Sequence, residues 1–139
     1  MQGSASAERG LIDTSVFIAR ESGRALGALP PAAAISVVTV AELHLGVLMA
    51  DRPSVRARRL RTLTSVQNLF EPLPIDADVA CAFAEIVAET HRQGRRPKIM
   101  DTWIAATAFT HDLSVYTQDD DFTAISGIRV VRVWGSAVR

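Results

Sequence analysis

The sequence predicts an α/β fold, a three-layer α/β/α sandwich in which helices cover both faces of a largely parallel central sheet. Short apolar runs typical of strands alternate with longer amphipathic segments typical of helices along the whole chain. The chain has 139 residues, which is enough for one compact core but not comfortably for two. We therefore expect a single domain at 11–135, with a disordered Ser/Ala-rich tail at 1–10 and a short tail at 136–139.

The first half of the chain is expected to form two strands and three helices. A short apolar run predicts a strand at 11–13, and a helix starts in the segment 14–20 that follows it. A loop rich in proline and glycine separates this helix from a second apolar strand at 33–38. Helices follow at about 39–50 and 53–70, and the second begins with proline, which suits the first turn of a helix.

The second half is expected to alternate in the same way. A brief strand is expected at 73–75, bounded by Pro72 and Pro74, and Asp76 is suited to cap the helix after it. Asp101 opens a further helical pattern, and a strand follows at 113–117. An acidic turn then leads to the last strand, at 130–133.

Four acidic residues lie in separate segments, each beside apolar sequence that the fold would bury: Asp13, Glu42, Asp101 and Asp119. Asp13 and Asp119 follow strands, and Glu42 is expected in the first turn of a helix after a strand. Ligands of such folds collect beyond the carboxyl ends of the strands. An unpaired buried carboxylate costs roughly several kcal/mol, so these groups are usually protonated, paired or bound to a metal.

Converging carboxylates are the ligands that Mg²⁺ and Mn²⁺ prefer in proteins. A carboxylate site without a covalent nucleophile indicates hydrolysis of a phosphodiester by a metal-activated water. Two hydroxyls, Ser15 and Thr117, are interpreted as hydrogen-bond donors to these carboxylates, because no histidine base lies near either in sequence.

Each acid also has a structural alternative. Glu42 has the right spacing to complete a capping box with Thr39, and Asp101 and Asp119 suit helix caps or turns. The acidic triplet that begins at Asp119 also matches the Asp-x-Asp-x-Thr signature of haloacid-dehalogenase-like phosphatases, but too little chain follows it for that larger domain.

The formal charge is balanced, with 15 basic and 15 acidic side chains, so any affinity for nucleic acid must come from local patches. One basic group crowds the turn before Asp101, where we expect the backbone of a nucleic acid to bind: Arg92, Arg95, Arg96 and Lys98. A second group of arginines, at helical spacing between 52 and 61, is equally well explained as a solvated helix face.

The sequence also bears on location. Its single cysteine, Cys81, cannot form an internal disulfide, which is compatible with the cytoplasmic location that we expect. The first ten residues lack the basic-then-apolar order of a secretory signal. Prolines break the longest uncharged stretch, at 25–41, so we expect no transmembrane segment and no membrane partner.

Three parts of the chain carry recognisable motifs. They are LIDTSV at 11–16, SVVTVAEL at 36–43 with Gly46 beyond it, and the block from DTWIAA at 101–106 to TQDDDF at 117–122. In order and spacing they resemble PIN-domain ribonucleases, and among these the VapC-type toxins of type II (VapBC) toxin–antitoxin systems. The resemblance implies a PIN-like sandwich.

The resemblance also implies a function. Members of the family are metal-dependent endoribonucleases that cut structured RNAs such as transfer or ribosomal RNA. A VapB-like antitoxin neutralises them by inserting a segment into the groove, and they form homodimers and larger hetero-oligomers with the antitoxin. The competing hypothesis is a PIN-like module that binds RNA or protein without cutting.

The four acids fall on the acidic positions of the family. By that resemblance Asp13, Asp101 and Asp119 would bind Mg²⁺, with Mn²⁺ as a substitute, and Glu42 would complete the catalytic site directly or through water. Asp121 extends the acidic turn. It is expected either to assist the metal site from outside the ligand set or to cap the short helix after it.

Overall fold

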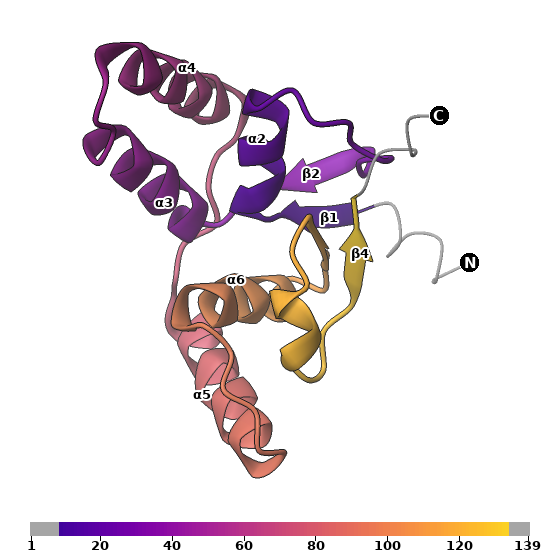
Figure 1. Cartoon of the computed structure of the whole chain (residues 1–139). Helices are drawn as coiled ribbons and strands as arrows, with labels where there is room; N and C mark the ends of the chain where they lie inside the picture. Colours follow the sequence, from indigo (N-terminus) through magenta and orange to yellow (C-terminus); the bar gives the residue numbers. More distant parts are fainter. Residues whose placement is uncertain (1–8, 134–139) are drawn as a thin grey trace.

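Figure 1 shows the computed structural model of the chain, which describes residues 9–133. The predicted tail at 136–139 and all but two residues of the predicted tail at 1–10 lie outside the described residues. The elements in order are β1 (Arg9–Ile12), α2 (Thr14–Glu21), β2 (Ala32–Ala34), α3 (Val37–Leu48), α4 (Pro53–Leu69), α5 (Ala77–Arg92), α6 (Ile99–Thr110), β3 (Ser114–Thr117), the 3₁₀ helix η1 (Asp121–Ala124) and β4 (Val130–Arg132).

The four strands form one parallel sheet in the order β2-β1-β3-β4. β1 lies between β2 and β3, and its register pairs Ile12 with Tyr116. The backbone N–H of Asp13 continues this pairing by donating to the Tyr116 carbonyl at 2.9 Å. The register therefore places Asp13, just beyond β1, beside the end of β3, where Thr117 lies.

Side chains that alternate along the two central strands divide the core into two parts. Leu11 and Val115 pack on one face with residues of α5 and α6. Ile12 and Tyr116 pack on the other face with residues of α2, α3 and α4. The sheet thus lies between two helical layers (Figure 1), which confirms the predicted three-layer sandwich.

The start of α3 differs from the prediction. The helix begins at Val37, and the Ser36 side chain caps it by accepting a hydrogen bond from the Val38 N–H at 3.0 Å. The strand predicted at 33–38 is correspondingly limited to Ala32–Ala34. β-branched residues after Ser36 indicated a strand, but the cap and burial of Val38 in the core favour the helix.

The strand predicted at 73–75 is also wrong. Only a single parallel bridge forms there, between Leu73 and Ser36. The Leu73 N–H donates to the Ile35 carbonyl at 2.8 Å, and the Leu73 carbonyl accepts from Val37 at 3.0 Å. Prolines flank Leu73 on both sides and have no N–H to extend the ladder.

The helix after this bridge begins as predicted. Asp76 caps α5, because its carboxylate accepts a hydrogen bond from the Val79 N–H at 3.0 Å. The helix packs against α6, where the rings of Phe83 and Trp103 stack with centroids 3.7 Å apart. None of the helices in residues 9–133 is long and apolar enough to cross a lipid bilayer.

Candidate active site

A cavity of about 410 Å³ lies at the carboxyl edge of the sheet, between α2, α3 and α6. Its lining includes all four acids singled out from the sequence: Asp13, Glu42, Asp101 and Asp119. We call this cavity the acidic cleft. Parallel strands deliver the first and last of these acids to the same edge, and helices α3 and α6 supply the other two.

Asp13 is the N-cap of α2 and is only 2% exposed. Its Oδ2 atom accepts hydrogen bonds from the Ser15 hydroxyl at 2.6 Å and from the Thr117 hydroxyl at 2.9 Å. The Ser15 N–H also points to this oxygen, at 3.3 Å. These bonds fix the carboxylate at the N-terminus of the helix.

The same two hydroxyls tie Asp13 to the loop that carries Asp119. Ser15 Oγ lies 3.1 Å from Thr117 Oγ1 and accepts from the Gln118 N–H at 2.9 Å. Thr117 Oγ1 accepts from the Asp119 N–H at 3.0 Å. Ser15 and Thr117 therefore hold two acids of the cleft in a fixed relation, as hydrogen-bonding groups rather than as nucleophiles.

Glu42 lies in the second turn of α3, not in the first, because the helix begins at Val37. The capping box with Thr39 is wrong, since Ser36 is the cap and Thr39 is fully buried within the helix. The carboxylate accepts instead from the Thr14 hydroxyl at 2.6 Å.

Thr14 was not identified from the sequence, although it directly follows Asp13 in the first motif. Its hydroxyl bonds Glu42 across the cleft and lies 3.0 Å from the Thr39 hydroxyl. Burial raises the pKa of Glu42, the Thr14 hydrogen bond opposes that rise, and the negative charge of Asp13 adds to it.

Asp101 lies in the first turn of α6 and is 8% exposed. Its Oδ2 atom is buried and has no hydrogen-bond partner among the described residues. Burial and the nearby charge of Asp13 raise the pKa of Asp101 to about 7. Burial likewise raises the pKa of Asp119, with a further contribution from Asp13. The cleft therefore holds more negative charge than its own side chains neutralise.

This donor set fits a hard divalent cation. Carboxylate and hydroxyl oxygens line the cleft, and the Oδ2 atom of Asp101 is a buried acceptor without a donor. In their present positions, no three carboxylate, imidazole or thiol groups of residues 9–133 are close enough to hold one ion. An ion held by one or two of these carboxylates would complete its coordination with water.

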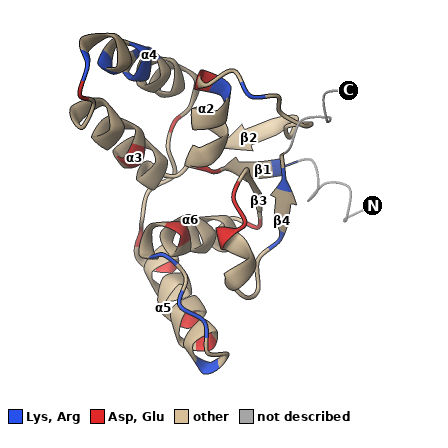
Figure 2. Ribbon diagram, in the orientation of Figure 1, with Lys and Arg blue, Asp and Glu red and all other residues tan. Residues whose placement is uncertain are grey.

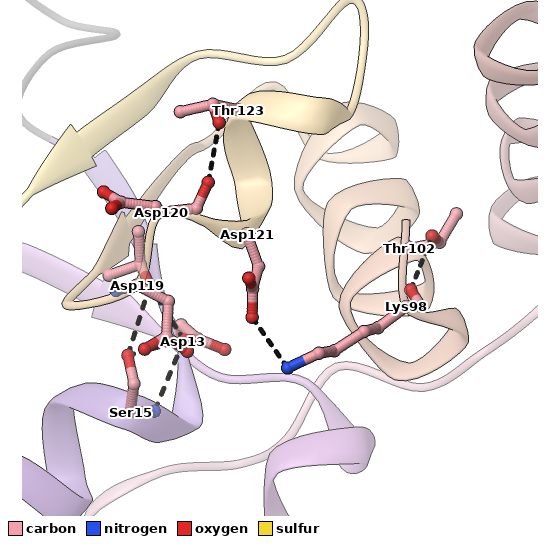
Figure 3. Close-up of polar contacts among 9 residues, drawn as sticks. Asp13, Ser15, Lys98, Thr102, Asp119, Asp120, Asp121 and Thr123 are labelled. Carbon is pink, nitrogen blue, oxygen red and sulfur yellow. Dashed lines mark hydrogen bonds and ion pairs between the residues drawn. The ribbon is translucent and has the colours of Figure 1, made fainter. Parts of the chain in front are cut away.

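The three acids of the turn after β3 have different surroundings (Figure 3). Asp119 lines the acidic cleft, whereas Asp120 forms an ion pair with Arg132 of β4, a side chain that is not labelled there. Asp121 pairs with Lys98, whose Nζ lies 2.9 Å from its Oδ2. Asp121 is also not the cap of η1, because Asp120 occupies the N-cap position. One of the two predicted roles for Asp121 is therefore wrong.

The basic residues expected to bind RNA have different partners. Arg92 ends α5, which extends away from the sheet (Figures 1 and 2), and pairs with Glu89 at 2.7 Å. Arg95 points to a backbone carbonyl of η1 at 3.4 Å, and Arg96 is exposed. Lys98 alone among the four contacts an acid of the turn beside the cleft.

Replacing Thr14 by valine is expected to lower activity at the cleft. Valine keeps the shape of threonine but cannot donate to Glu42, so the pKa of Glu42 should rise further. We expect roughly a tenfold lower rate, the scale of about one lost hydrogen bond to a charged group, because Glu42 is no longer held in place, and the acidic limb of the pH profile should move to higher pH. A pH profile of turnover measures this, and a profile unchanged from the wild type would contradict it.

The chain is similar to known proteins over most of its length. The family model of the PIN domain matches residues 10–128. Ribonuclease VapC5 of Mycobacterium tuberculosis is 48% identical over 129 residues, which cover 89% of this chain and 95% of that protein. Ribonuclease VapC4 of the same organism is 42% identical over 131 residues, which cover 90% of this chain and 97% of that protein.

A solved structure is similar in fold over nearly the same length. It is the crystal structure of VapBC-5 from Mycobacterium tuberculosis, a member of the VapBC family of toxin–antitoxin systems. The matched chain superposes with a TM-score of 0.79 at 43% sequence identity, covering 91% of this chain and 98% of that one. The likeness therefore extends over most of the fold described above.

Proposed function

The chain belongs to the PIN-domain family, and we propose from this premise that it is a metal-dependent endoribonuclease, the toxin of a VapBC-type toxin–antitoxin pair. The relatives at 48% and 42% identity are named ribonucleases, which supports RNA as the substrate. One observation carries the proposal: four acids from four separate segments line a single cleft at the carboxyl edge of the sheet.

In this proposal Asp13, Asp101 and Asp119 hold Mg²⁺, or Mn²⁺ in its place, and Glu42 completes the site directly or through water. The bound ion supplies a water of lowered pKa and stabilises negative charge on the phosphate. The hydroxyls of Ser15 and Thr117 keep Asp13 in one orientation. The remaining step, proton transfer, is assigned to a side chain of the protein.

Glu42 is suited to move a proton. Thr14 holds its Oε1 atom, which leaves Oε2 free to accept the proton of an attacking water. Burial raises the pKa of Glu42 above its ordinary value, and a general base works best when its pKa lies nearer the working pH.

The surroundings of the cleft support a protein inhibitor as well as a substrate. Exposed apolar side chains flank the acids: Ile18, Leu45 and Met49 are 47%, 58% and 69% exposed. Apolar groups around a charged centre are typical of surfaces that a partner covers. We propose that a VapB-like antitoxin covers this region in the cytoplasm. The complex would be a hetero-oligomer built on a toxin homodimer.

We also propose that the substrates are structured RNAs such as transfer or ribosomal RNA.

Asp13→Asn is the direct test of cleavage. Purified wild-type protein is expected to cut total cellular RNA in Mg²⁺, whereas the variant and the EDTA-treated wild type are expected to leave it intact. Asp112→Asn is the matched control, because Asp112 is an exposed aspartate paired with Arg129 at the opposite edge of the sheet. RNA fragments are measured by sequencing their 5′ ends.

Two outcomes would contradict the proposal. Equal cutting by Asp13→Asn would mean that the acidic cleft is not the active site. RNA binding that survives EDTA, with no cleavage by the wild type, would identify a PIN-like binding module instead.

A further inference from the structure

Lys98 differs from the other basic residues of its segment because its ammonium group lies beside the acidic cleft. Nζ donates to Oδ2 of Asp121 at 2.9 Å, and Figure 3 shows this pair next to Asp119. Burial raises the pKa values of three acids of the cleft, and the positive charge of Lys98 opposes that rise at each of them: Glu42, Asp101 and Asp119. The ammonium group therefore lies close enough to the acidic cleft to act on its charges.

Both ends of this lysine are held. Its backbone carbonyl accepts from the Thr102 N–H at 3.0 Å and from the Thr102 hydroxyl at 2.8 Å. Thr102 is fully buried and directly follows Asp101 in α6, so the start of the side chain is fixed relative to the cleft. Asp121 fixes the far end and raises the pKa of Lys98 through its hydrogen bond, which keeps the amine charged.

The cleft needs such a cation to admit an anionic strand. RNA carries one negative charge at each phosphate, and four carboxylates at one site repel it. An ammonium group has three N–H donors. One of those of Lys98 serves Asp121, and the 74% exposure of its side chain leaves the others open to a ligand.

We propose that Lys98 is a catalytic residue that donates to a phosphate oxygen at the scissile bond, and that Asp121 is a positioning residue that holds the ammonium group there. The inference rests on the proposed function and deepens it. It assigns Asp121 to Lys98 rather than to the metal ligands. It also separates Lys98 from Arg92, which is paired within α5 at the far end of that helix.

A purely structural role of the Lys98–Asp121 pair predicts different results. An exposed ion pair adds little to stability, so a structural Lys98–Asp121 pair would leave turnover almost unchanged when broken. The chain offers a matched control in the exposed pair of Arg129 with Asp112 at the opposite edge of the sheet. Arg129→Ala removes one charge and one ion pair, together with hydrogen bonds to Ser114 and to the Asp112 carbonyl, without touching the acidic cleft.

The first experiment compares cleavage of a defined RNA by Lys98→Ala, Lys98→Arg, Asp121→Asn and the double variant Lys98→Ala/Asp121→Asn. We expect Lys98→Ala to lower kcat/KM at least roughly tenfold, Lys98→Arg to recover part of the loss, and Arg129→Ala to match the wild type. Asp121→Asn is expected to lower kcat/KM less than Lys98→Ala. The double variant should be no worse than Lys98→Ala, because a positioning residue acts only through its partner.

The second experiment measures binding without cleavage. In an Asp101→Asn background, a single-stranded RNA oligonucleotide is titrated against the protein at several salt concentrations. Loss of one phosphate contact in Lys98→Ala should reduce the slope of log K against log salt by about 0.7. Binding of Mn²⁺ to the wild-type background should be unaffected by Asp121→Asn.

Several results would overturn the inference. They are full cleavage by Lys98→Ala, an unchanged salt slope, or a loss of Mn²⁺ binding in Asp121→Asn, which would make Asp121 part of the metal site. A different result would contradict the proposed function, namely a wild-type protein that cuts no RNA. In that case the salt slope still decides whether Lys98 contacts phosphate.

Discussion

Asp101→Asn is expected to abolish RNA cleavage while making the protein more stable at pH 8. We expect a metal bound at this site to stabilise the transition state by about 4 kcal/mol. Loss of a carboxylate that holds the metal should remove this stabilisation and lower the rate about 1,000-fold. The same substitution also removes a buried negative charge. That charge destabilises the folded protein, because Oδ2 of Asp101 has no hydrogen-bond partner among the described residues. Activity and stability should therefore change in opposite directions.

The stability effect has a definite dependence on pH. The pKa of Asp101 is about 7 in the folded protein and 3.8 in its ordinary state, so the unfolded chain ionises this group more readily. Stability is therefore lost as pH rises from about 4 to about 7, and it stays lost above that. Water that enters the open cleft screens part of the unfavourable energy of the ionised Asp101 carboxylate. We therefore expect this carboxylate to lower the free energy of unfolding by about 2 kcal/mol at pH 8.

Thermal unfolding in EDTA at two pH values measures this effect. Asp101→Asn should melt several degrees above the wild type at pH 8 and close to it at pH 4, where the wild-type carboxyl is already neutral. Asp112→Asn serves as the control, since Asp112 is exposed and has a left-handed φ of 56° that asparagine tolerates. Equal melting temperatures of Asp101→Asn and wild type at pH 8 would refute the expected cost of burying this charge beside Asp13.

Addition of Mg²⁺ is expected to stabilise the wild type strongly. At a concentration about 100 times its dissociation constant, a ligand that binds only the folded state adds about 2.7 kcal/mol. For a chain of this length that corresponds to a rise of roughly 10 °C in Tm. Asp13→Asn and Asp101→Asn should show little of this rise, because each removes a carboxylate that lines the cleft.

The metal effect should also depend on pH. Asp101 must lose its proton to bind a cation, and with a pKa of about 7 it is mostly protonated at pH 6 and mostly ionised at pH 8. The apparent affinity for Mg²⁺ should therefore be about tenfold weaker at pH 6. Calorimetric titration at the two pH values tests this. A rise in Tm that is equal in wild type and Asp101→Asn would show that the ion binds elsewhere.

The alternation of apolar runs was sufficient to predict the fold. Strands near Leu11, Val115 and Val131 were predicted close to their observed places, because each is a short β-branched or aliphatic run bounded by polar residues. The errors lie where local propensity competed with tertiary contacts. Ser36 caps α3 in the middle of a β-branched run, and the bridge at Leu73 forms between two prolines.

The roles within the acidic turn could not be predicted from the sequence. Three consecutive aspartates are chemically identical, yet Asp119 lines the cleft, Asp120 pairs with β4 and Asp121 pairs with Lys98. The partners of Asp120 and Asp121 are Arg132 and Lys98, which lie 12 and 23 positions away along the chain. The hydrogen bond from Thr14 to Glu42 was missed for the same reason.

The sequence by itself determined which residues carry the chemistry: four carboxylates set beside apolar segments, in an order and spacing that resemble the PIN-domain ribonucleases. Only the tertiary structure decided that these acids share one cleft, that Asp101 has a buried oxygen without a partner, and that Lys98 is held beside it. The physical reason is that residue type and burial follow local patterns. Distances between segments depend on the parallel register of β1 with β3 and on the packing of α3 and α6 at the same edge of the sheet.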